Sequence, residues 1–147
     1  LQALINLNIA DDAFITPEKD REVRNAMIEY IDELLKFLPK NRGFISGVDP
    51  NTGNIEDIYD VGGNIVSATL MQRIGQGNVI RCVISNPLSN SNYKINSSIE
   101  SLGTIGQDNE IKPIVFTIID ELTFEIYIED VGSAQNLKIH LETISLD

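Results

Sequence analysis

The sequence predicts a mainly β fold, an antiparallel β-sandwich or jelly roll preceded by one long N-terminal α-helix. Three observations support this fold class. The only strong helical pattern lies before residue 39, almost everything after Gly62 alternates apolar and polar residues with period two, and turn formers separate the alternating runs. We expect an N-terminal segment with an oligomerisation helix at 1–43, a turn-rich connection at 44–63 and a β-sandwich domain at 64–147.

The helix is expected to begin at Thr16-Pro17-Glu18, which supplies a hydroxyl N-cap, a proline at the first helical position and an acid in the first turn. The helical pattern runs to about Leu38 and stops at Pro39. The sequence therefore predicts a helix over 17–38.

Two apolar seams run along this helix at spacings of three and four residues. One contains Val23, Met27, Tyr30, Leu34 and Phe37, and the other contains Ile28, Ile31, Leu35 and Leu38. A helix on one side of a small domain usually needs only one apolar stripe. The helix is therefore either sunk deep in its own domain, or it packs one seam on its own β domain and the other on a symmetry-related copy. We favour self-association.

The segment 44–63 is rich in turn formers and predicts a hairpin-like excursion or an ordered linker. Its oxygen-bearing residues have a spacing like that of a calcium loop, with Asp49, Asn51, Gly53, Ile55, Asp57 and Asp60 at positions one, three, five, seven, nine and twelve. Position five lacks a side-chain oxygen, and position six is Asn54 where the bend needs glycine. We expect an ordinary turn and no bound metal.

Six strands are expected in the β domain. They are 65–72, 78–85, 93–99, 113–119, 122–129 and 137–146, separated by turn signals such as Gly75-Gln76-Gly77 and Asp120-Glu121. In 122–129 the inward residues Leu122, Phe124, Ile126 and Ile128 alternate with polar or aromatic ones. Short strands with one apolar face and no helices between them indicate two packed antiparallel sheets.

Catalytic constellations are mostly excluded by the residues present. His140, the one histidine, shares the solvent face of its strand with Lys138 and Glu142, and Cys82, the one cysteine, lies in an apolar run that indicates a buried structural thiol. These residues supply no nucleophilic triad and no His/Cys zinc site, so we expect no enzyme and no cofactor. A hydrolase built on a pair of carboxylates ranks third among the functional hypotheses.

The composition of the chain limits the classes of partner that it can bind. The chain has 147 residues, 42% of them hydrophobic, and a net charge of -11, which repels phosphate backbones and anionic lipids, so we expect neither a nucleic-acid nor a membrane partner. No stretch has the roughly 20 consecutive apolar residues of a membrane helix. The sequence begins with Leu1 in place of Met, so we expect a processed product or part of something longer.

If the β domain has an activity, we expect it to be recognition by polar loops. The loops 86–92 and 103–110 interrupt strands and carry amide and carboxylate side chains that can bind the hydroxyl groups of a sugar. The candidate ligand-binding residues are Asn90, Asn92, Gln107 and Asp108. The alternative is that both loops are solvated turns.

The segment 7–34 resembles a short module of tail-fibre and other virion proteins of tailed bacteriophages. The matching residues are Ile9, Ala10, Asp11, Ile15, Thr16, Pro17, Arg21, Glu22, Asn25, Ile28, Ile31, Asp32 and Leu34. The resemblance implies a structural role in the virion, usually as a homotrimer, with the β domain decorating the particle or touching the host.

The leading hypothesis is therefore a phage virion component, a fibre or tip protein that assembles through its helix and displays its β domain. Its expected partners are further copies of the chain, other virion proteins and a host-surface glycan. The alternative is a carbohydrate-binding or lectin-like module without catalytic activity, for which a sandwich is an equally good scaffold. The absence of Trp counts modestly against that alternative.

Overall fold

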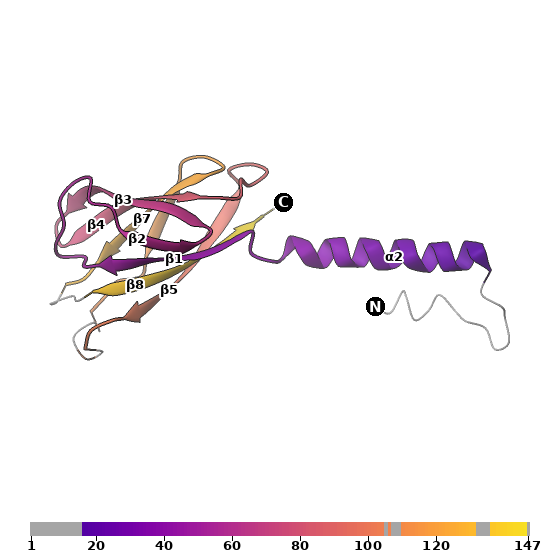
Figure 1. Cartoon of the computed structure of the whole chain (residues 1–147), viewed down its shortest axis with the longest axis horizontal. Coiled ribbons are helices and arrows are strands. Elements are labelled where there is room, and N and C mark those ends of the chain that lie inside the picture. The colour runs from indigo at the N-terminus through magenta and orange to yellow at the C-terminus, as the bar shows by residue number, and fades with distance from the viewer. Residues whose placement is uncertain (1–15, 105, 107–109, 132–135, 147) are drawn as a thin grey trace. The chain divides into compact units, whose positions relative to one another are not determined.

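A computed structural model describes residues 16–104, 106, 110–131 and 136–146. The chain divides into two compact units between Leu38 and Pro39. The first contains helix α2 (Pro17–Lys36), and the second contains the strands of the described residues (Figure 1). The first strand begins at Asn41, so the domain boundary that we predicted after residue 43 cuts through it and is wrong.

Helix α2 confirms the predicted start signals. The side chain of Thr16 accepts a hydrogen bond from the Lys19 N–H at 3.3 Å, and Pro17 occupies the first turn, where its missing N–H costs nothing. The helix ends at Lys36 and Phe37 forms its C-cap, close to the predicted end.

The β domain is a sandwich of two four-stranded sheets, in which every strand pair is antiparallel (Figure 1). Sheet A has the order β2 (Asp60–Gly63), β1 (Asn41–Val48), β8 (Leu137–Ser145) and β5 (Tyr93–Ser101). Sheet B has the order β3 (Ile65–Ile74), β4 (Gly77–Ile84), β7 (Thr123–Glu129) and β6 (Val115–Ile118). The predicted fold class is confirmed.

All six predicted strands are present, but β1 and β2 lie where we expected an N-terminal segment and a turn-rich connection. The alternation of apolar and polar residues did not predict β1, because the first buried residue of this strand is polar. Asn41 is only 1% exposed, its Nδ2 donates to the Asn86 carbonyl and to Thr143 Oγ1 at 3.0 Å each, and its Oδ1 accepts from the Asn86 N–H at 3.1 Å. Two glycines in the same strand weaken the apolar pattern further.

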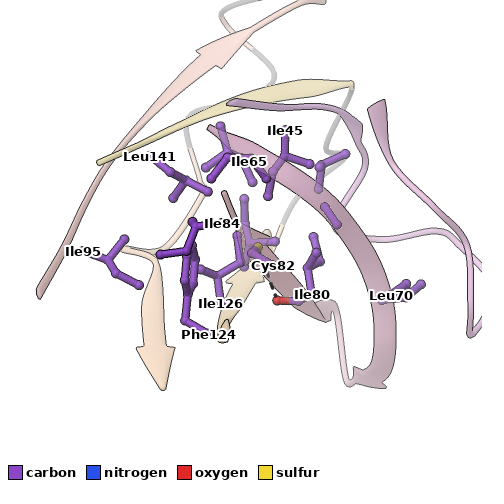
Figure 2. Packing of buried hydrophobic residues seen from close by; sticks show 14 of the residues in the cluster. Ile45, Ile65, Leu70, Ile80, Cys82, Ile84, Ile95, Phe124, Ile126 and Leu141 are labelled. Carbon is purple, nitrogen blue, oxygen red and sulfur yellow. Dashed lines mark hydrogen bonds between the residues drawn. The ribbon is translucent and has the colours of Figure 1, made fainter. Parts of the chain in front are cut away.

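The core consists of the inward residues of both sheets (Figure 2). Phe124, Ile126 and Ile128 are fully buried, as their alternation predicted, whereas Leu122 is 38% exposed in the hairpin that precedes β7. Facing them from sheet A are Ile45, Ile139 and Leu141 together with other apolar side chains of β1, β8 and β5. The alternation of inward and outward residues therefore determines which face of each sheet packs into the core of the sandwich.

Residues 49–59 connect β1 and β2 as an ordered excursion, which confirms the hairpin-like alternative. The loop lies along β3, where Tyr59 N–H donates to Ala68 O at 2.9 Å and Leu70 N–H donates to Asp57 O at 2.8 Å. It is anchored by Asn78 of β4, a fully buried residue whose Nδ2 donates to the carbonyls of Asp49 and Thr52 at 3.0 Å each. The same amide lies 3.3 Å from the Tyr59 hydroxyl.

We predict that Asn78→Ala destabilises the β domain by about 1–3 kcal/mol, because the main-chain carbonyls of Asp49 and Thr52 lose the buried amide that donates to them. Asn54→Ala is the matched control, since Asn54 is exposed in the same loop. Urea unfolding followed by far-ultraviolet circular dichroism measures both variants. Equal stability of the two would show that Asn78 does not hold the loop.

Candidate functional site

The apolar face of α2 is a candidate interaction surface. The predicted oligomerisation residues are Val23, Met27, Ile28, Tyr30, Ile31, Leu34, Leu35 and Leu38. From Met27 onwards they are exposed, from 39% for Tyr30 to 57% for Ile28, as is the neighbouring Phe37 at 74%, and Val23 is half-buried. No residue of the helix is buried. The face is therefore open to a covering surface, and self-association through it stays a prediction.

The two predicted seams form one broad face. At 3.6 residues per turn, the apolar residues from Met27 to Leu38 cover about half of the circumference of the helix. The opposite face is polar and carries the surface ion pair between Lys36 and Glu33, at 2.7 Å. An apolar arc of this width exceeds the seam of a two-stranded coiled coil and suits a bundle of three or more helices.

The described residues of the two predicted ligand-binding loops do not form a common site. The Asn90 side chain caps a turn by accepting a hydrogen bond from the Asn92 N–H at 2.6 Å, so its oxygen serves the local fold. The Asn92 carbonyl in turn accepts from the Leu146 N–H. Gln107 and Asp108 lie outside the described residues. Recognition through these loops stays a prediction.

A shallow hollow of about 400 Å³ lies on the outer face of sheet B. The residues around it come from all four strands of the sheet and are Gln72, Ile74, Val79, Val115, Thr117, Glu125, Ile126 and Tyr127. The sequence placed Glu125 and Tyr127 on the outward face of their strand. It could not place Gln72 or Thr117 beside them, because only the strand order joins β3 and β6 to the same sheet.

The polar groups of this hollow are held in place by their neighbours. Arg81 donates through Nε and a terminal nitrogen to Glu125 Oε1, at 3.0 and 2.7 Å. The Tyr127 hydroxyl donates to the Ile74 carbonyl at 3.1 Å, and Gly77 allows the ring to lie across β4, since a Cβ there would be 2.5 Å from the hydroxyl. Fixed polar groups beside apolar side chains are typical of small-ligand sites.

The outer face of sheet A carries charges of both signs. His140 shares this face with Lys138 and Glu142, as predicted, and its Nε2 lies 2.8 Å from Glu100 Oε2. The hydrogen bond from His140, aided by the nearby Lys138 ammonium, lowers the pKa of Glu100. Lys138 also lies over the Phe44 ring, 4.3 Å from its centroid. His140 is thus a member of a surface charge network.

Cys82 confirms the interpretation of a structural thiol. Its side chain is fully buried in the core and lies 3.8 Å from the Ile80 carbonyl (Figure 2). Burial raises the pKa of the thiol well above its usual range. The thiolate that nucleophilic chemistry requires is therefore strongly disfavoured.

The carboxylates of the calcium-like loop cap turns. Asp49 Oδ1 accepts from the Asn51 N–H at 2.9 Å, and Asp57 Oδ2 accepts from the Asn54 N–H at 2.6 Å. Both aspartates thus serve the backbone of their own turns. Among the described residues, no three His, Cys, Asp or Glu side chains are grouped closely enough to hold a metal ion.

We predict that millimolar calcium leaves the melting temperature unchanged and that EDTA has no effect, because the turn-capping oxygens do not converge on one point. A cation that binds only the folded chain would add about 2.7 kcal/mol of stability at a concentration of one hundred times its Kd. Differential scanning calorimetry with and without calcium measures this. A rise in melting temperature that Asp49→Asn and Asp57→Asn abolish would contradict the prediction.

Comparisons with protein-family models, with curated proteins and with solved structures found no match to this chain. The described part of the chain holds no helix that is long and apolar enough to cross a membrane.

Proposed function

We propose that this chain is a structural protein of a phage virion, a fibre or tip component that self-associates through α2 and displays its β-sandwich. The observation that carries the proposal is the exposed apolar face of the helix, where eight large hydrophobic side chains from Met27 to Leu38 are at least 39% exposed. Contiguous exposed apolar surface of this kind marks a site of interaction with another surface.

The energetics support self-association. Covering the exposed half of a large aliphatic side chain contributes about 1 kcal/mol, so eight such side chains contribute about 8 kcal/mol per chain before the cost of association. Most of the stability of a helix in a protein comes from the packing of its apolar face and not from its intrinsic helix propensity. Association and helix formation are therefore coupled.

The width of the apolar arc favours a homotrimer over a dimer, and the resemblance to phage fibre modules points the same way. Thr16, Pro17, Arg21, Asn25, Ile28 and Ile31 lie in the described part of that segment, whereas Ile9, Ala10, Asp11 and Ile15 lie outside it. In a virion, the remaining partners would be other virion proteins and a host surface that the β domain contacts.

We predict that Ile31→Glu combined with Leu35→Glu lowers the mass of the particle in solution about threefold and reduces its helix content. Both side chains are about half exposed in the single chain, so the charges cost little there, but in a desolvated seam each charge is strongly unfavourable. Light scattering coupled to size exclusion, together with circular dichroism, measures the change.

The control is Arg21→Glu combined with Asn25→Glu, which has the same spacing on the polar face. This control should keep the parent mass. If the seam variant also keeps the parent mass and stability, the apolar face is not an interface and the proposal fails.

A second candidate function, glycan recognition, is favoured by the hollow on sheet B. Its Gln72, Thr117 and Glu125 side chains offer donors and acceptors beside the apolar surface of Val79 and Val115. Sugars bind to such mixtures of hydrogen-bonding groups and apolar side chains. This function is compatible with display on a virion and does not require it.

We predict that the double variant Gln72→Ala, Thr117→Val binds any glycan that the parent binds on an array at least tenfold more weakly. Both changes remove hydrogen-bonding groups and leave the core intact. The comparison variant replaces Asn90, Asn92, Gln107 and Asp108 with Ala. Loss of binding in the comparison variant alone would assign recognition to the loops. Equal binding by all three proteins would exclude both surfaces.

A further inference from the structure

Strand β5 is the long, regular edge of the sandwich. It spans nine residues and pairs with β8 without a bulge, and no other described strand pairs with its outer side. The other edge strands are less able to pair with a further strand. Strands β2 and β6 have only four residues each, and β3 is bulged and lies against residues 56–59. A long unpaired edge is a template for a further strand unless something covers it.

We propose that β5 pairs with β5 of a second copy of this chain, antiparallel and centred on Ser97. This register uses the whole strand and places Tyr93 opposite Ser101, Lys94 opposite Glu100, Ile95 opposite Ile99 and Asn96 opposite Ser98. Sheet A then continues across a two-fold axis into a sheet of eight strands. The contact is isologous, since the same residues meet from both sides.

The charges of β5 select the second copy as the partner. Lys94 and Glu100 are each three residues from Ser97 and carry opposite charges. The two-fold axis therefore places Lys94 of each copy opposite Glu100 of the other copy, which gives two attractive pairs. Charged residues on edge strands often serve to prevent pairing. A strand protected against its own copies would carry like charges at these two positions, where they would repel.

The pleat restricts the alternatives to this register. Residues that face each other across an antiparallel pair must lie on the same face, so the register can shift only in steps that keep this parity. Every shifted register leaves strand ends unpaired and separates Lys94 from Glu100. The register centred on Ser97 pairs Lys94 with Glu100, Ile95 with Ile99 and Asn96 with Ser98, and it places Tyr93 opposite Ser101 at the strand ends.

Burial along β5 fits a strand that lacks its neighbour. Ser97 is on the inward side of the strand, between Ile95 and Ile99, yet it is exposed, and Ile99 is only half-buried. A second β5 would cover this inward row and complete the burial of Ile99. Glu100 is kept ionised by His140 and Lys138, so it meets the partner's Lys94 as a carboxylate.

This pairing is independent of the helix. A two-fold contact cannot be satisfied by all three copies inside one three-helix bundle, so it joins two bundles. In the Ile31→Glu, Leu35→Glu background it leaves a dimer of the full chain. Failure of the helix proposal and failure of the strand proposal are therefore separate outcomes.

Charge reversal in that background tests the inference. Lys94→Glu and Glu100→Lys, each alone, place like charges opposite each other twice, and each should raise the dimer Kd about tenfold. An equimolar mixture of the two variants restores both attractive pairs and should recover the parent mass. Lys40→Glu, an equal charge change at an exposed residue outside β5, should leave the Kd unchanged.

A disulfide in the full chain tests the register. Ser97→Cys should cross-link two copies on mild oxidation, because the two residues 97 face each other within the reach of a disulfide. Ser101→Cys should not, because its two copies lie about 27 Å apart in this register. The native Cys82 is buried and does not compete. Equal cross-linking of the two variants, or no recovery on mixing, would overturn the proposal.

Discussion

The burial of two apolar sheet faces against each other is the constraint on which the β domain depends. Fully buried side chains of β1 and β8 pack on those of β4 and β7, so each central strand carries one inward row that cannot shift by a residue without exposing it (Figure 2). The outward rows are free of this constraint. The hollow on sheet B and the charge network on sheet A are both built from them.

Most of the fold could be predicted from local pattern. Thr16 and Pro17 mark the start of α2, and the alternation in β7 predicts which of its residues are buried, because both signals act over a few neighbouring residues. Strand β1 could not be predicted in this way, since Asn41 is buried by hydrogen bonds to Asn86 and Thr143, residues far away in the sequence.

The candidate surfaces likewise differ in whether local sequence pattern could predict them. The apolar residues of α2 were identified because a helix repeats its face every three or four residues, and the helix in the structure carries them on one face. The hollow around Gln72 and Glu125 depends on which strands are neighbours in sheet B, and spacing along the chain carries no information about that. Asn90 was chosen for its amide, which instead caps a turn.

The anchoring of residues 49–59 by Asn78 has a consequence for sequence variation. The buried amide binds the loop at the main-chain oxygens of Asp49 and Thr52, which any residue would provide. Substitution at the exposed tip, at Asn54 or Ile55, thus leaves the anchoring contacts in place. One deep side chain fixes the path of the loop while its surface chemistry can diversify, which makes this loop a natural place to graft new binding specificities.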